Sequence, residues 1–222
     1  MTITRASALA RQISPRSLRH LLILDFEATC GDSVPPDEQE IIEFPTLLYD
    51  IKEAKVLAEF HGYVKPTRHP VLTDFCTTLT GITQETVDSA DTFPAVWSRF
   101  NEFLKVHNVF RDPAPYAFLT CGHWDLRHML PAQHAYYLAK EPTLAPLDPI
   151  FSRWINVKVA FRKHYKKKQN KSMTSMLSQL QLPLEGKHHS GIDDCRNIAR
   201  IVERMQKDGW KPSSSDLWEP KS

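Results

Sequence analysis

Hydrophobic and polar positions follow two different periods along this chain, with strand patterns in the first part and helical patterns after them. The run Leu21-Leu22-Ile23-Leu24 has no polar interruption before Asp25. Such a run is typical of a strand that is buried on both faces at the centre of a sheet. Two further strands are predicted over residues 42–49 and 56–64. The spacing between these runs indicates an antiparallel meander.

Helical spacing governs many of the apolar residues that follow. Asp91 or Thr92 can cap a helix that carries Pro94 in its first turn, where proline is tolerated. The next predicted elements are a strand over 116–121, a helix from about residue 124 and a helix over 154–165. The last helix has the clearest pattern and stops before Gly209. Its apolar face is formed by Ile198, Ile201, Val202 and Met205.

The order of these elements predicts the fold class. Strands that come first and then alternate with helices are typical of an α/β domain with a mixed sheet. The length of 222 residues fits one ordinary domain with short tails. We therefore expect a basic N-terminal tail over residues 1–19, one domain over 20–210 and a polar C-terminal tail over 211–222. We expect the protein to be a monomer.

Composition narrows the classes of protein that fit. Hydrophobic residues make up 41% and charged residues 24% of the chain, so we expect a packed core and not disorder. No apolar run approaches the roughly 20 residues that a membrane helix needs, so we expect no membrane association. The net charge is only +2. A nucleic-acid partner would therefore need a local basic surface.

The cysteines and the N-terminus bear on localisation. The four cysteines lie far apart in the sequence, at positions 30, 76, 121 and 195. This spacing argues against a zinc site and favours a reduced, cytoplasmic or nuclear protein. The first twenty residues carry arginines among serines and threonines, with no acidic residue before Asp25. That composition is typical of a mitochondrial transit peptide; the alternative is a basic tail that touches RNA or has no role.

Two carboxylates follow the first strand, at Asp25 and Glu27. Alternate strand residues point to the same face, so both side chains project together. Two buried like charges are costly unless a cation lies between them, and hard oxygen ligands suit Mg²⁺ or Mn²⁺. The alternative is a solvated strand end on which one carboxylate makes a salt bridge.

Two other places in the sequence add acidic residues. Asp125 follows the strand predicted over 116–121 and lies in a first helical turn, where aspartate is also common for structural reasons. Asp193 and Asp194 open the last helix, and the loop before it contains His188 and His189. The helix dipole is a structural explanation for such acids, and a loop histidine is usually only exposed to solvent. Four acids and one histidine at three strand or helix ends would suit two-metal phosphodiester hydrolysis.

The order of these residues is Asp-x-Glu, then Asp, then His-x4-Asp, which resembles the DEDDh (DnaQ-like) exonucleases. Further stretches resemble the Eri-type branch of that family, which includes the histone-mRNA 3′-exonuclease. They are residues 25–30, 40–45, 79–84, 90–94, 154–156 and 193–200. The resemblance covers about residues 20 to 210, and so many blocks in the same order argue against chance.

The resemblance implies a ribonuclease H-like fold, two Mg²⁺ or Mn²⁺ ions and release of 5′-mononucleotides from single-stranded RNA or RNA 3′-overhangs. A DNA-trimming exonuclease of the same fold is the closest alternative, and a catalytically inactive RNA-binding module is a more distant one. The implied metal ligands are Asp25, Glu27, Asp125 and Asp194. His189 is the implied general base, because His188 lacks the four-residue spacing to Asp194.

Substrate contacts are implied for four residues. Phe75 and Trp124 match aromatic residues that contact the terminal nucleotide in the Eri-type branch, and core packing is their alternative. Leu79 and Ile82 are expected either near the terminal bases or in the core. Some Eri-type proteins carry an upstream SAP domain, for which about twenty residues before the first strand leave no room, so we do not expect stem-loop specificity of that kind.

One dense basic run, over residues 162–168 with Lys171, is interrupted by Tyr165 and His164. Either it contacts the phosphate backbone of a nucleic acid, or it is a solvated loop.

Overall fold

The computed structural model describes residues 18–110 and 116–218. Its strands are β1 (His20–Leu24), β2 (Glu27–Ala28), β3 (Ile41–Asp50), β4 (Lys55–Tyr63), β5 (Tyr116–Thr120), β6 (Trp154–Asn156) and β7 (Leu217–Trp218). Its α-helices are α1 (Asp74–Thr80), α2 (Gln84–Asp88), α3 (Phe93–Val106), α4 (Leu130–Leu138), α5 (Val157–His164), α6 (Met173–Gln179) and α7 (Gly191–Lys207). A π-helix over Asp125–Met129 precedes α4, and short 3₁₀ turns cover Pro36–Glu38, Pro149–Ser152 and Ser214–Asp216.

The strands form one mixed sheet in the order β2-β3-β1-β5-β6-β7, and β4 pairs with β3. β1 is antiparallel to β3, and β3 is antiparallel to β4, so the predicted meander is confirmed. β1, β5 and β6 are parallel, and their carboxyl ends meet at one edge of the sheet. The predicted α/β domain with a mixed sheet is therefore confirmed.

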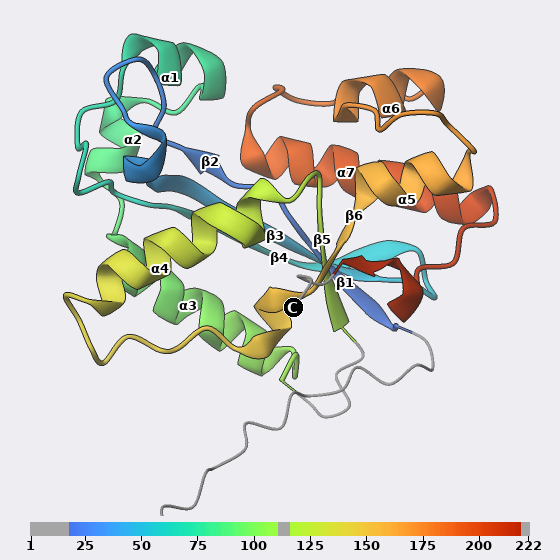
Figure 1. The fold of residues 1–222 in the computed structure, drawn as a ribbon, viewed down its shortest axis with the longest axis horizontal. Helices are drawn as coiled ribbons and strands as arrows, with labels where there is room; N and C mark the ends of the chain where they lie inside the picture. Colours follow the sequence, from blue (N-terminus) through green and yellow to red (C-terminus); the bar gives the residue numbers. More distant parts are fainter. Residues whose placement is uncertain (1–17, 111–115, 219–222) are drawn as a thin grey trace, which may run out of the picture.

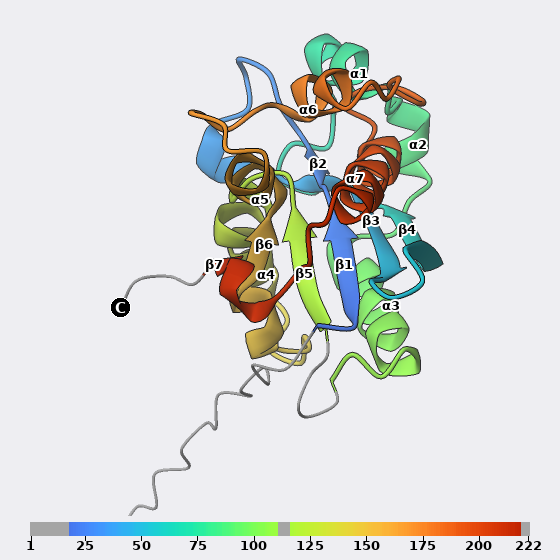
Figure 2. The same ribbon diagram turned by 90° about the vertical axis from the view of Figure 1, so that its right-hand side faces the viewer.

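Helices cover both faces of this sheet (Figure 1). α3 and α4 pack on one face, and α5, α6 and α7 pack on the other. In the turned view, the strands lie side by side and α7 crosses the sheet in front of β1 and β3 (Figure 2). The two short helices α1 and α2 lie beyond the end of the sheet that β2 approaches.

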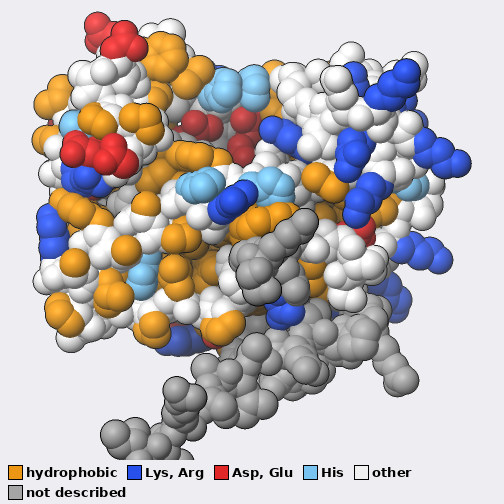
Figure 3. All heavy atoms as spheres, viewed as in Figure 1, with side chains coloured by type: hydrophobic (Ala, Val, Ile, Leu, Met, Phe, Trp, Pro, Cys, Tyr) orange, Lys and Arg blue, Asp and Glu red, His pale blue; other side chains and the backbone are white. Residues whose placement is uncertain are grey.

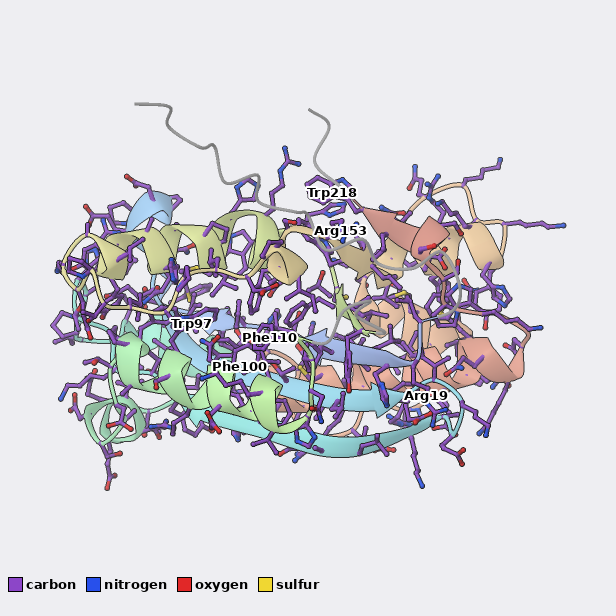
Figure 4. The ribbon with its side chains drawn as sticks, turned by 90° about the horizontal axis from the view of Figure 1, so that it is seen from below. Arg19, Trp97, Phe100, Phe110, Arg153 and Trp218 are labelled. Atoms are coloured by element: carbon purple, nitrogen blue, oxygen red, sulfur yellow. The ribbon has the colours of Figure 1, made fainter. Side chains whose placement is uncertain are left out.

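The strand β1 shows why the apolar run needs two hydrophobic layers. Leu22 and Leu24 belong to the core beneath α3 and α4, whereas Leu21 and Ile23 belong to the core beneath α7. The side chains alternate between these faces, as successive strand residues must. On α3, Trp97 and Phe100 point into the first of these cores, and both are fully buried (Figure 4). β1 is therefore held rigidly from both sides at the point where Asp25 follows it.

One predicted helix differs from the structure. The segment 154–165 was expected to be one helix, but its first three residues form β6 and only Val157–His164 is helical. The apolar Trp154 and Ile155 are buried in opposite cores, as strand residues are. Asn156 then caps α5 by accepting the backbone N–H of Lys158.

The tails also differ in part from the expectation. Leu217 and Trp218 lie in the predicted polar tail, yet they form β7 and pair with β6 at the edge of the sheet. At the other end, Leu18 is buried and Arg19 forms an ion pair with Asp50. The rest of the predicted N-terminal tail, and the transit-peptide prediction with it, lies outside the described residues. Within residues 18–110 and 116–218, no helix is long and apolar enough to cross a membrane.

Candidate active site

Asp25 and Glu27 lie at the carboxyl end of β1, where the chain leaves the centre of the sheet. Glu27 begins β2 and is 8% exposed. One carboxylate oxygen from each of Asp25, Glu27 and Asp194 lies within 4.8 Å of the others. The structure therefore brings together two of the predicted acids with one that is almost 170 residues away in the sequence.

Asp125 reaches the same place from the other side. It begins the π-helix just after β5, and its Oδ1 accepts a hydrogen bond of 3.0 Å from the backbone N–H of Phe26. Phe26 lies between Asp25 and Glu27, so this bond fixes Asp125 against the acid pair. π-helices are rare, and they occur frequently at functional sites. The 4.8 Å group of Asp25, Glu27 and Asp194 does not include Asp125, which lies beside it.

α7 brings Asp194 to the site through a close approach to β1. A Cβ atom at Gly191 would lie only 2.7 Å from the backbone oxygen of Asp25. Glycine is therefore needed at the first residue of α7. Three residues further along the helix, Asp194 is 2% exposed and faces the carboxylates.

Both histidines of the loop before α7 contact Asp194. The ring nitrogen Nδ1 of His188 lies 3.1 Å from Asp194 Oδ2, and the backbone N–H of His189 donates to the same oxygen at 3.1 Å. The two rings stack with their centroids 3.9 Å apart. His189 adopts a left-handed backbone conformation with φ of 65°, which is uncommon for a residue with a side chain. Ligand atoms of His188, His189 and Asp194 form a second group within 4.8 Å.

The electrostatics of the site reflect crowded, buried negative charge. Burial, and then the charges of Asp125, Asp194 and Glu27, raise the pKa of Asp25 well above its ordinary value. Burial and the neighbouring Glu43 raise the pKa of Glu27 to about 9.

The two remaining acids show the same effect. Burial raises the pKa of Asp125 to about 6 and also raises the pKa of Asp194. Carboxylates packed in this way need positive charge between them to be ionised together, and their oxygen atoms are hard ligands. The donor set therefore fits divalent cations such as Mg²⁺ or Mn²⁺.

Two residues near the carboxylates were not singled out from the sequence. Glu43 lies opposite Glu27 in the β2–β3 pairing and is 1% exposed. Its Oε1 pairs with Nε2 of His61 at 2.8 Å. A glutamate inside the strand predicted over 42–49 was a usable signal, because a buried charge needs dedicated partners. Lys158, in the first turn of α5, is near enough to lower the pKa of Asp25 and of Asp125.

The four residues predicted to contact substrate divide into two kinds. Phe75 on α1 is 59% exposed, and Trp124 just before the π-helix is 40% exposed, so neither ring is used for core packing. Leu79 is half-buried. Ile82 is 4% exposed and packs in a small core with Ile42, Leu72, Cys76 and Val87. Of the two alternatives for Ile82, contact with the terminal bases or core packing, the structure supports core packing.

The space-filling view shows how this site is set into the surface (Figure 3). Carboxylates lie at the bottom of a hollow, with histidine side chains at its rim. Hydrophobic side chains are frequent on the side of α1 and α2, and lysine and arginine side chains gather on the side of α5 and α6. The arrangement can hold cations at the centre, aromatic contacts on one side and phosphates on the other.

Comparison with known proteins agrees with this geometry. Residues 22–202 match the family model described as exonuclease (RNase_T). The chain is 38% identical over 192 residues to human 3′-5′ exoribonuclease 1, and 39% identical over 196 residues to ERI1 exoribonuclease 3 from Mus musculus. These matches cover 86% and 88% of this chain but 53% and 56% of the relatives, so the chain spans about half the length of the curated relatives it matches.

Solved structures agree with the sequence comparison. A 3′-exonuclease described in 3′-end-specific recognition of a histone mRNA stem-loop superposes with a TM-score of 0.79 at 35% identity, covering 93% of this chain and 92% of that one. The nuclease domain of 3′hExo, a DEDDh family member bound to rAMP, gives a TM-score of 0.76 at 38% identity, covering 88% and 96%. The fold is ribonuclease H-like, as the sequence resemblance implied.

Proposed function

Because this chain belongs to the RNase_T exonuclease family, in its DEDDh, Eri-type branch, we propose that it is a 3′→5′ exoribonuclease. The substrate would be single-stranded RNA or an RNA 3′-overhang, and the products would be 5′-mononucleotides. The observation that carries this proposal is the meeting of Asp25, Glu27 and Asp194, with Asp125 beside them, at the carboxyl ends of β1 and β5. Members of this family depend on divalent metal ions.

The four acids would hold two Mg²⁺ or Mn²⁺ ions. Bound cations of this kind stabilise both the attacking and the leaving oxygen of a phosphodiester. The charges of Glu27, Asp125 and Asp194 all raise the pKa of Asp25, so the four side chains would act as one ligand set. Phe26 would keep Asp125 oriented through its backbone N–H. Glu27 would also help to orient the attacking water.

His189 would accept the proton of that water. Its pKa is lowered by burial and by the neighbouring His188, so the ring is neutral and ready to accept a proton at physiological pH. The left-handed backbone at His189 turns the loop so that its N–H binds Asp194 while the ring remains half-exposed. His188 would then support Asp194 through its ring nitrogen.

The exposed rings of Phe75 and Trp124 would stack on the terminal nucleotide or its neighbour, with Leu79 beside them. Aromatic stacking tolerates any base, which suits an enzyme that removes nucleotides one after another. The names of the relatives favour RNA over DNA. Discrimination requires a contact to the 2′-hydroxyl.

The test uses 5′-labelled RNA and DNA oligomers, each single-stranded or with a 3′-overhang. Wild-type protein, Asp25→Asn and a control variant, Glu141→Gln at an exposed site, are incubated with Mg²⁺, Mn²⁺ or chelator. A ladder that shortens from the 3′-end with wild type and control, and not with Asp25→Asn or chelator, supports the proposal. A stronger ladder on DNA would favour the DNA-trimming alternative. RNA binding without any ladder would favour an inactive binding module.

A further inference from the structure

We propose that one face of α5 and the turn after it bind the phosphate backbone of the substrate strand upstream of the bond that is cut. We call this face the α5 basic stripe and define it as Lys158, Arg162 and Lys166, flanked by Lys163, Lys167, Lys168 and Lys171. This proposal rests on the proposed function. It describes where the RNA upstream of the cut bond would lie on the protein.

The α5 basic stripe begins at the active site. β6 is parallel to β5, and Asn156 at its end lies opposite Thr120, so α5 starts at the same edge of the sheet as Asp125. Lys158, two residues after Asn156, carries the positive charge that lowers the pKa of both Asp25 and Asp125. The helix then runs away from the carboxylates alongside α7 (Figure 1).

Helical geometry places Lys158 and Arg162 on one face of α5. Lys158 and Arg162 are four residues apart on α5, and Lys166 continues the same spacing just after the helix. Residues four apart lie on one helix face, and each step advances about 6 Å at a rise of 1.5 Å per residue. Arg162 therefore lies about 6 Å beyond Lys158 along the helix axis, and Lys166 extends the row of basic residues into the turn after the helix.

The stripe and its flanking lysines differ from the basic residues of α7 in their ion pairing. None of these seven cations forms an ion pair with any residue in the described part of the chain. The neighbouring helix α7 is different. Each basic residue on it is paired with an acid, namely Arg196 with Glu59, Arg200 with Glu185, Arg204 with Asp208 and Lys207 with Glu203. The uncompensated positive charge is thus concentrated on the side of α5, where Figure 3 shows it.

The turn after α5 is also fixed in place, which a solvated loop does not require. The Tyr165 hydroxyl donates to Asp208 at 2.7 Å, and its ring packs on Phe161. Lys166 then has a φ of 51°, and the N–H of Lys167 bonds back to the carbonyl of Arg162. Glycine is the usual residue at such a helix end. A lysine there costs stability but adds a positive charge to the turn after the helix.

The opposite wall of the site gives the direction of the strand. Phe75 on α1 is expected at the terminal nucleotide, and α1 and α5 lie on opposite sides of the view in which the hollow holds the carboxylates (Figures 1 and 3). A strand whose 3′-end is held near Phe75 would leave the site toward α5. Phosphate contacts there carry no sequence information, so the stripe would hold any RNA long enough to reach it.

The first experiment measures binding in chelator, where hydrolysis is not expected. The probes are fluorescein-labelled U12 and U3 RNA, followed by fluorescence anisotropy from 50 to 200 mM KCl. The test variant is Arg162→Gln/Lys166→Gln/Lys167→Gln. The control variant, Lys52→Gln/Lys105→Gln/Lys207→Gln, removes the same charge from exposed lysines that are paired with acids. Lys158 is left intact because it lies beside the carboxylates.

We expect the test variant to raise the Kd for U12 at least tenfold at 100 mM KCl, with a much smaller effect on U3. The slope of log Kd against log salt should fall by about 2, because each phosphate of a single strand that the protein neutralises contributes about 0.7 to that slope. An unchanged slope, or an equal effect of the control variant, would overturn the proposal. Since binding needs no turnover, wild-type protein that binds through the stripe but does not shorten RNA would contradict only the proposed function.

A second variant separates binding from folding. Lys166→Gly removes one charge and places the favoured residue at the left-handed position, so Tm should rise by about 2 to 4 °C. U12 binding should nevertheless weaken about threefold. Tighter or unchanged U12 binding by this more stable protein would overturn the assignment of Lys166 to the stripe.

Discussion

The carboxylate of Glu43 accepts a hydrogen bond of 2.9 Å from the backbone N–H of Gly191, although the two residues are 148 positions apart. The N–H of Ile192 donates to the other oxygen at 3.1 Å. Ser190, the residue before α7, makes no capping bond with its own side chain. A side chain from β3 therefore caps the helix that carries Asp194, and it ties the third part of the site to the sheet.

Replacing Glu43 with alanine should lower activity, although Glu43 is not one of the predicted metal ligands. Two buried N–H groups and His61 would lose their partner, at a cost of about 1 to 3 kcal/mol in the free energy of unfolding. We expect kcat to fall at least tenfold, with Glu43→Gln intermediate because one oxygen remains. Urea unfolding and initial rates measure both effects. Wild-type kcat in Glu43→Ala would show that the cap does not position Asp194.

Metal ions should reverse the effect of Asp25→Asn on stability. In chelator, removing one of four crowded acids relieves repulsion, so Asp25→Asn should have a higher Tm than wild type. With Mg²⁺ or Mn²⁺ the order should invert, because wild type gains binding energy that the variant lacks. Thermal unfolding of both proteins, with Ca²⁺ as a further ion, tests this. A wild-type Tm that no divalent ion changes would argue against a metal site.

The two histidines should differ in their effect on the rate. His189→Ala should lower kcat by about 10²- to 10⁴-fold, the range for loss of a general base, while metal binding persists. His188→Ala should lose less, because its ring contacts Asp194 and the backbone N–H of His189 remains as a second donor. Initial rates of the two variants at saturating RNA concentration test this ranking. The opposite ranking would assign the proton transfer to His188.

Phe75 and Ile82 are close in sequence but should respond differently to truncation. Phe75→Ala removes an exposed ring, so KM for RNA should rise severalfold while the unfolding free energy stays within about 0.5 kcal/mol of wild type. Ile82→Ala removes a buried side chain and should cost about 2 to 4 kcal/mol. Urea unfolding and KM measurements on both variants test this contrast. A loss of stability in Phe75→Ala would mean that the Phe75 ring packs against the rest of the protein.

A pH-dependent contribution to stability is expected far from the active site, at Asp50. Burial alone would raise the pKa of Asp50, but hydrogen bonds from the backbone of Glu53 and from Arg19 hold it below the ordinary value. Because the folded-state pKa is the lower one, this stabilisation is present above about pH 4 and is lost as the pH falls through the folded-state value.

Asp50→Asn should therefore be about 1 to 3 kcal/mol less stable than wild type at pH 7. The difference should shrink as the pH falls through the folded-state pKa of Asp50. Urea unfolding of both proteins at several pH values measures it, and the subtraction removes the contribution of other titrating groups. A constant difference from pH 7 to pH 3 would contradict the assigned role of the carboxylate.

Sequence patterns predicted those parts of the fold that depend on local periodicity. The central strand followed from the uninterrupted run at Leu21–Leu24, and the last helix followed from its 3.6-residue spacing. The pattern was wrong for residues 154–156, because a buried strand of three residues has the same apolar content as a helix start. The short helices α1 and α6 have capped N-termini at Thr73 and Ser172 but too few residues for a clear period.

The acids of the site could be predicted from the sequence, but the contacts that hold them in place could not. Asp25, Glu27, Asp125 and Asp194 stand out as acids at strand and helix ends, and the structure brings them to one edge of the sheet. The bond from Phe26 to Asp125 spans 99 residues, and the cap from Glu43 to Gly191 spans 148. Contacts over such separations depend on the whole topology, so no local pattern reveals them.

The separation of the ligands along the chain has a consequence for synthesis on the ribosome. Asp25 emerges early, Asp125 near the middle and Asp194 late, and no two of these stretches can form the site alone. A nascent chain thus lacks the complete set of predicted metal ligands until α7 has been synthesised. The proposed cleavage would become possible only after α7 has emerged and docked against the end of β1, so the topology would delay this activity until the domain has been synthesised.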